Sequence, residues 1–136
     1  MIRAYDKTYL EDAMLNLAVA LDYGSIACAG GIDEFYDRML AGNVIRQFEK
    51  GNPKYVSGLS GIELGTKIIE STGGCARDYN YVLDDRSAIF WTGWVLAYLQ
   101  WYTNVSFKSL NVKGIDVHRV MNMYPTFHEA DISKFV

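Results

Sequence analysis

The apolar positions of the chain recur mostly with the period of an α-helix. The clearest stripe starts at residue 10 and continues to residue 28, with apolar residues spaced i, i+3, i+4 and i+7. Its inward positions are Leu10, Ala13, Met14, Leu17, Ala18 and Leu21. Its other faces carry Glu11, Asp12, Asn16 and Asp22. Thr8 and Glu11 have the spacing of a capping box at the start of this helix, and Gly30-Gly31 predicts its end.

Similar signals divide the following residues into shorter helices. Asp33 marks the start of a second helix, whose inward positions are Ile32, Phe35, Tyr36, Met39 and Leu40. A short third helix is predicted by Val44, Ile45 and Phe48 and is ended by Gly51. Asn52-Pro53 predicts a turn. A second capping box, Ser60 with Glu63, opens a helix that ends near Gly73-Gly74.

The second half of the chain begins with a predicted loop over residues 74–85 and a long helix over 87–103. Ser106 is expected to cap a short helix that carries Phe107 and Leu110. Another helix follows Gly114, with Ile115, Val120 and Met121, and must end before Pro125. Thr126 and Glu129 form a third capping box, which predicts a terminal helix through Ile132 and Phe135.

These elements predict an all-α fold. Almost no segment alternates between apolar and polar residues with the period of a strand, and both prolines lie outside the helical patterns. A chain of 136 residues, half of them hydrophobic, is long enough for one core. We therefore expect a single domain over residues 1–136, a compact bundle of six or seven helices around the central segment 87–103.

That segment belongs to an uncharged stretch, residues 87–107, which reads SAIFWTGWVLAYLQWYTNVSF. It is long enough for a membrane span, but polar residues such as Thr92 and Gln100 interrupt it and its aromatic residues are not gathered at two interfaces. A helix that is apolar on every side is usually buried at the centre of a protein. Because three Trp residues lie close together on it, we also expect part of its aromatic surface to emerge and bind.

Charge and cysteine usage limit the functions that the chain can have. The formal net charge is −3, and the five basic residues after residue 85 are scattered, which argues against a nucleic-acid-binding face. The N-terminal residues carry acids where a signal peptide needs an apolar core, so we expect a cytoplasmic protein with reduced thiols. Cys28 is expected in the core, and Cys75 in an exposed loop.

No pattern in the sequence defines a catalytic, metal or cofactor site. GGIDEF (30–35) resembles the signature of diguanylate cyclases, but an extra Ile interrupts it, and we interpret it as a helix end followed by a helix start. His118 and His128 lack zinc-ligand spacing. We therefore predict a protein that is not an enzyme and needs no metal or cofactor.

Five short blocks together resemble a family of small all-helical proteins of anaerobic Firmicutes. They are GNPKY (51–55), SGIEL (60–64), W-x-G-W-x-L-A-x-x-Q-W-Y (91–102), SFKSL (106–110) and MYPTFHEADI (123–132). Members of this family are encoded beside small genes of toxin-antitoxin type, including ADP-ribosyltransferase-like proteins. The family has no established activity, so the resemblance implies no catalytic residue. It implies a genomic setting that favours binding to a partner.

Three functional hypotheses follow. The first is an interaction protein, antitoxin-like or accessory, which binds another protein, such as a neighbouring gene's product, through a partially exposed aromatic and acidic surface; self-association is left open. The second is a small-molecule binder in which aromatic residues form a pocket and His128 or Arg86 binds a polar group. The third is a DNA-associated regulator. The candidate binding residues are Trp91, Trp94, Tyr98, Trp101 and His128.

Overall fold

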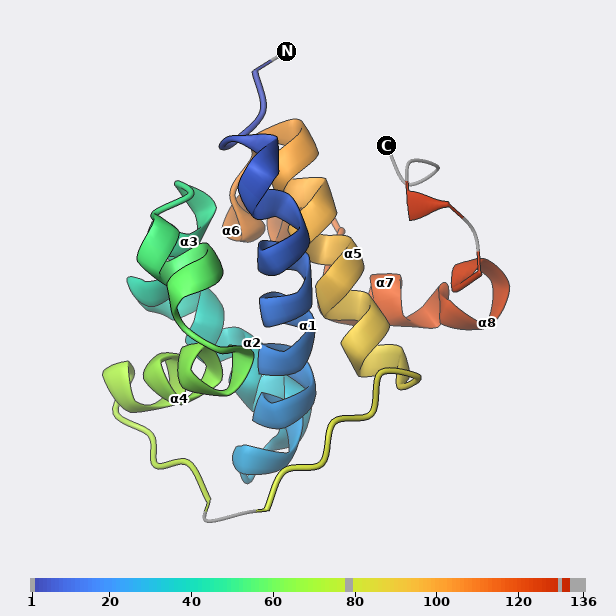
Figure 1. The fold of residues 1–136 in the computed structure, drawn as a ribbon. Coiled ribbons are helices and arrows are strands. Elements are labelled where there is room, and N and C mark those ends of the chain that lie inside the picture. Colours follow the sequence, from blue (N-terminus) through green and yellow to red (C-terminus); the bar gives the residue numbers. More distant parts are fainter. Residues whose placement is uncertain (1, 78–79, 130, 133–136) are drawn as a thin grey trace.

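The computed structural model describes residues 2–77, 80–129 and 131–132, and its regular structure is helical throughout, which confirms the predicted all-α fold (Figure 1). The described part contains α1 (Leu10–Ala27), α2 (Gly31–Ala41), α3 (Val44–Glu49), α4 (Gly61–Ser71), α5 (Ala88–Thr103), α6 (Phe107–Val112), α7 (Val117–Asn122) and α8 (Tyr124–Phe127). A 3-10 turn (Lys7–Tyr9) precedes α1, and a π-helical turn (Lys54–Gly58) precedes α4. This is close to the predicted number of helices.

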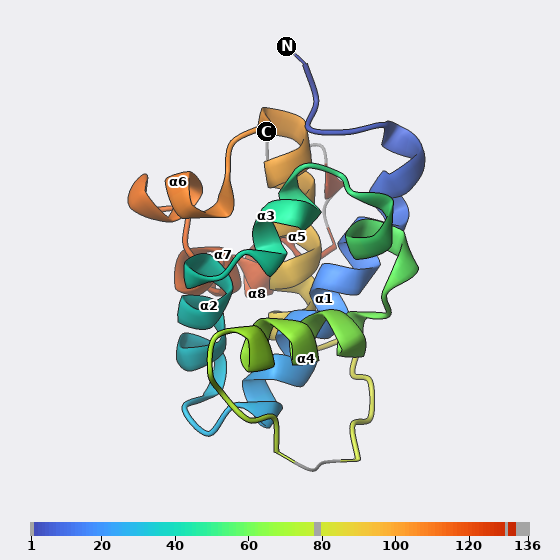
Figure 2. The ribbon, with the colours of Figure 1, turned by 90° about the vertical axis from the view of Figure 1, so that its left-hand side faces the viewer.

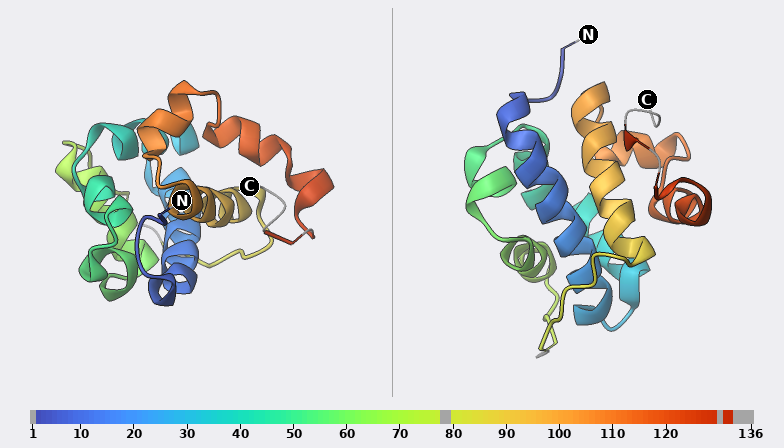
Figure 3. Two further views of the ribbon diagram at one scale, coloured as in Figure 1. Left: turned by 90° about the horizontal axis from the view of Figure 1, so that it is seen from above. Right: turned by 45° about the vertical axis from the view of Figure 1, so that its right-hand side comes forward.

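The two longest helices, α1 and α5, pack side by side at the centre of the fold (Figure 3). Gly93 makes this close packing possible, because a Cβ atom there would lie 2.7 Å from the carbonyl oxygen of Leu17 and 2.8 Å from Cα of Ala18. Helices α2, α3 and α4 form a layer on one side of the pair (Figure 2), and α7 and α8 pack beside α5. The aromatic-rich helix is therefore central, as predicted, but shares that position with α1.

The hydrophobic core includes residues from all but the shortest helices. Phe35 of α2, Phe48 of α3 and Phe107 of α6 are completely buried, and the rings of Phe48 and Phe107 lie 6.2 Å apart. The apolar stripe predicted for the first helix is buried as expected. Cys28 is buried and Cys75 is exposed, which confirms both predictions. Within the described residues, no helix combines the length and hydrophobicity that crossing a bilayer requires.

Of the three capping boxes predicted from the sequence, the structure confirms one and contradicts two. Ser60 and Glu63 cap α4 reciprocally, with bonds of 3.0 and 3.1 Å. Thr8 instead lies inside the 3-10 turn, where its N–H donates to Asp6, so Asp6 is the capping residue. Thr126 lies within α8, which starts two residues earlier with a proline in its first turn, so it caps no helix. The predicted continuation through Phe135 lies outside the described residues.

Asp22, which the sequence predicts outside the apolar stripe of the first helix, is buried beneath the segment that precedes α5. The residue is 5% exposed, and its carboxylate accepts hydrogen bonds from Tyr81 Oη at 2.6 Å and from Ser87 Oγ at 2.9 Å. Both donors come from the segment before α5. In the same region, the N–H of Arg77 donates to the carbonyl oxygen of Ala27. These bonds fasten the described parts of the loop between α4 and α5 to α1.

Candidate binding groove

The predicted binding residues differ strongly in exposure. Trp91 and Trp101 are each only 7% exposed, whereas Trp94 and Tyr98 are half-buried and His128 is exposed. Tryptophan side chains are large enough to contribute to a core and still present an edge to solvent. The aromatic surface of α5 that emerges is therefore formed by Phe90, Trp94, Tyr98 and Tyr102, which are all half-buried.

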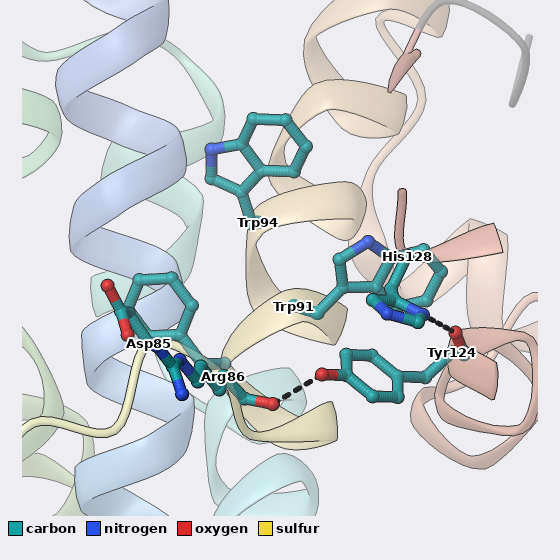
Figure 4. A pocket seen from close by; sticks show the side chains of 7 residues that line it. Asp85, Arg86, Trp91, Trp94, Tyr124 and His128 are labelled. Carbon is teal, nitrogen blue, oxygen red and sulfur yellow. Dashed lines mark hydrogen bonds between the residues drawn. The ribbon is translucent and has the colours of Figure 1, made fainter. Parts of the chain in front are cut away.

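A pocket of about 280 Å³ lies between α5 and α8, and we call it the Arg86 pocket (Figure 4). Its lining residues come from three places in the sequence: Asp85 and Arg86 before α5; Phe90, Trp91 and Trp94 on α5; and Tyr124 and His128 at α8. The fold thus brings together Trp91, Trp94 and His128 of the predicted set. It also brings in Arg86, which the sequence had suggested as an alternative polar group.

The outer wall of the Arg86 pocket is held by two hydrogen bonds and ring packing. Tyr124 Oη donates to the carbonyl oxygen of Arg86 at 2.5 Å, which ties α8 to the start of α5. The ring of Trp91 meets the ring of Tyr124 edge-on at 5.7 Å. His128 stacks on Tyr124 at 4.4 Å, and its Nδ1 lies 2.7 Å from the Tyr124 carbonyl oxygen. Nδ1 must therefore carry a hydrogen, so Nε2 is an acceptor in the neutral ring.

A larger hollow of about 470 Å³ lies along the seam between α1 and α5, and we call it the Arg3 pocket. Leu10 and Met14 of α1 form one side, and Trp94, Tyr98 and Trp101 of α5 form the other. Arg3, Lys7, Tyr102, Asp131 and Ile132 complete the lining. Tyr98 and Trp101, the two predicted residues absent from the Arg86 pocket, are therefore found here.

The N-terminal segment fixes the upper end of the Arg3 pocket. The indole Nε1 of Trp101 donates to the carbonyl oxygen of Tyr5 at 2.7 Å, and the N–H of Ala4 donates to the Trp101 carbonyl oxygen at 3.0 Å. The guanidinium of Arg3 lies 3.6 Å from the centre of the Tyr102 ring and donates to the Tyr102 carbonyl oxygen. Such a cation–π contact holds the charge beside the aromatic rings.

Trp94 lines both pockets, so the two adjoin along α5. A smaller hollow of about 230 Å³, lined by Lys7, Leu10, Glu11 and Met14, adjoins the Arg3 pocket on α1, because three of its four residues are shared. We call these three hollows together the aromatic groove. It contains all five predicted residues and extends from α8, past Trp94, to the N-terminal turn.

Several groove residues could not be predicted as site residues. Leu10 and Met14 reach the groove only because α1 packs against α5, and Arg3 only because the N-terminal segment bonds to the end of α5; no local pattern signals either contact. Tyr124 lies in the MYPTFHEADI block that carried the family resemblance, but the block gave it no role.

The other histidine lies away from the groove. Nε2 of His118 in α7 lies within hydrogen-bond distance of the carboxylate of Asp33 in α2. Among the described residues, no group of three or more His, Cys, Asp or Glu side chains is placed to hold a metal ion.

Comparison with known proteins gives no indication of function, so the functional proposal is based on the aromatic groove. No protein-family model matches the chain, and neither the curated proteins nor the solved structures include a match. The resemblance to the Firmicute family therefore stays a prediction.

Proposed function

We propose that this protein is a non-enzymatic interaction module that binds a segment of another protein in the aromatic groove. The observation that carries the proposal is the position of Trp94 between two pockets, which joins the Arg86 and Arg3 pockets into one groove along α5. Tryptophan and arginine are the residues most enriched in the energetic centres of protein interfaces, and both are present here.

The shape of the groove favours a peptide segment over a compact ligand. Pockets for small molecules usually enclose most of the ligand surface, whereas these hollows follow one another along a helix seam. A helix or extended segment can place successive apolar side chains into such hollows. The rim carries both charges, with Arg3, Lys7 and Arg86 beside Glu11, Asp85 and Asp131, so polar residues of the partner can pair around an apolar centre.

The genomic setting implied by the family resemblance supplies a first partner to test. In this proposal, the module binds the product of the neighbouring toxin-type gene, as an antitoxin-like or accessory protein. The two proteins should be co-expressed and purified through a tag on the neighbouring product. We expect a stoichiometric complex with the wild-type chain, which His128→Ala and Arg86→Gln weaken. A chain that stays monomeric and unbound would contradict the proposal.

A second candidate function is binding of a small aromatic anion in the Arg86 pocket. It is favoured by the convergence of Trp91, Trp94 and Arg86 on one volume of about 280 Å³, which Asp85 also lines. This volume is just below the usual range of ligand pockets, about 300–1,000 Å³, so it suits a single small ring system. The side chain of Arg86 forms no ion pair among the described residues and can bind a carboxylate.

Titration calorimetry with indole-3-acetate tests the second candidate, with tryptamine as the probe of opposite charge. We expect indole-3-acetate to bind, tryptamine to bind at least tenfold more weakly, and Arg86→Gln to remove this preference. Lys54→Gln, which removes a charge outside the pocket, is the matched control. Equal binding of both probes, or a preference that survives Arg86→Gln, would exclude this site for an anion.

A further inference from the structure

A further pocket of the molecule lies outside the three hollows of the aromatic groove. It has a volume of about 360 Å³ and opens between α5 and the turn that joins α6 to α7. Val95 and Leu99 of α5 and Val120 of α7 are buried and form its inner surface. None of these residues lines either pocket around Trp94. We call this hollow the Arg119 pocket.

Two basic residues and no acidic residue line the Arg119 pocket. Lys113 and Arg119 are exposed at its rim, and the remaining lining is completed by Ile115 and Met123. Neither cation has an acidic partner within ion-pair distance among the described residues. The nearest acid in sequence, Asp116, accepts a hydrogen bond from the backbone N–H of Arg119 as the cap of α7.

Backbone geometry places the guanidinium of Arg119 close to the turn at the pocket rim. Gly114 has a φ of +88°, which glycine adopts without steric cost, and this conformation reverses the chain between Lys113 and Ile115. A Cβ atom at Gly114 would lie 3.3 Å from Nη1 of Arg119. The absence of a side chain at this position therefore leaves room for the guanidinium beside the turn.

We propose that the Arg119 pocket binds a small amphipathic carboxylate, such as a medium-chain fatty acid, with its chain against Leu99, Ile115 and Met123 and its carboxylate between Lys113 and Arg119. The apolar inner surface favours a hydrocarbon, because it offers few polar groups to any ligand. The rim favours a single anionic end, because both of its charged side chains are cations. Met123 can adjust to chains of different length, since its side chain is unbranched and flexible.

Titration calorimetry with decanoate, below its micellar concentration, tests this site. We expect one decanoate per chain and an affinity that falls about fourfold for each methylene removed in shorter acids. Lys113→Gln combined with Arg119→Gln should weaken decanoate binding about tenfold or more, because charge-assisted hydrogen bonds are lost. Lys50→Gln combined with Lys67→Gln gives the same change of net charge at exposed positions elsewhere and should leave the affinity unchanged.

Methyl NMR spectra locate the bound decanoate. The proposal predicts shifts of the methyl groups of Leu99, Ile115 and Met123, with little change at Leu10 and Met14 of the aromatic groove. Shifts centred on Leu10 and Met14, equal affinity for decanol, or no binding of decanoate would each overturn it. Because this readout is separate from partner binding at Trp94, the two proposals can fail independently.

Discussion

The hydroxyl group of Tyr81 donates a hydrogen bond of 2.6 Å to the buried carboxylate of Asp22, across 59 residues of sequence. The contact fastens the segment before α5 to the middle of α1. Tyr81→Phe would remove one of the two hydroxyl donors to this carboxylate. Removing a hydrogen-bond donor from a buried charged acceptor lowers the stability of the folded state by about 1–3 kcal/mol.

We therefore expect Tyr81→Phe to lower the free energy of unfolding by about 1–3 kcal/mol, measured by urea denaturation. Tyr55→Phe is the matched control, because the Tyr55 hydroxyl makes no hydrogen bond among the described residues. This substitution should change the stability by less than about 0.5 kcal/mol. Equal effects of the two substitutions would mean that the bond to Asp22 contributes nothing specific.

Gly93→Ala tests the close packing of the central helix pair. Alanine is favoured over glycine inside a helix by about 1 kcal/mol, but here the added methyl group would meet the backbone of Leu17 and Ala18 at under 3 Å. Since overpacking costs about 1–3 kcal/mol or more, we expect thermal denaturation to show a net loss of stability. Gly58→Ala is the control, because its nearest new contact would be an ordinary 3.5 Å. A stabilised Gly93→Ala variant would contradict the predicted clash.

Capping of α4 gives a third prediction. Ser60→Ala should cost about 1 kcal/mol, measured by urea denaturation, because Ser60 Oγ accepts the N–H of Glu63. Thr126→Ala should cost much less, because Thr126 lies within α8 and caps nothing. A larger loss for Thr126→Ala than for Ser60→Ala would contradict the assignment of helix starts.

The pH dependence of stability is predicted for two glutamates with opposite signs. Hydrogen bonds from Ser60 lower the pKa of Glu63, so its stabilising contribution is present above the ordinary value of 4.5 and is lost as the pH falls through the lower pKa of the folded state. Burial raises the pKa of Glu49, so the folded protein holds that proton more tightly than the unfolded chain. Stability is then lost as the pH rises from 4.5 through the higher pKa of Glu49.

Glu49→Gln isolates the second effect. Glu49 accepts a hydrogen bond of 2.6 Å from the N–H of Phe107, and the amide oxygen of Gln can still accept this bond. Unlike the Glu49 carboxylate, the Gln side chain carries no charge that burial must desolvate. We expect a variant whose unfolding free energy falls less than that of the wild type between pH 5 and pH 8, measured by urea denaturation at several pH values. A steeper fall in the variant would show that Glu49 is stabilised as the anion.

The sequence predicted most helices because their signals are local. Ser60, Ser87 and Ser106 each cap the helix that the spacing of apolar residues predicts. The burial of Asp22 was not predicted, because its hydroxyl donors come from Tyr81 and Ser87, far along the chain. Periodicity gives the face of a helix on which a polar residue lies, but it cannot reveal a distant segment that covers this face.

The candidate site was predicted only in part for the same reason. The five predicted residues were chosen from the aromatic-rich stretch and from one polar position, His128, and all of them line the aromatic groove. The opposite wall, formed by Leu10 and Met14, follows from helix packing. The Arg119 pocket was missed because Val95, Lys113 and Arg119 share no sequence pattern.

The affinity of the proposed partner, a neighbouring gene's product, for Trp94→Ala, measured by calorimetry beside the wild type, tests the central claim most directly. Trp94 is the residue shared by the Arg86 and Arg3 pockets, so its truncation should weaken binding by about 2 kcal/mol or more, which is about thirtyfold. Val112→Ala, at an apolar side chain that is 81% exposed outside the groove, should leave the affinity unchanged. Circular dichroism should show both variants folded. Undiminished binding by folded Trp94→Ala would contradict the assignment of the aromatic groove as the binding surface.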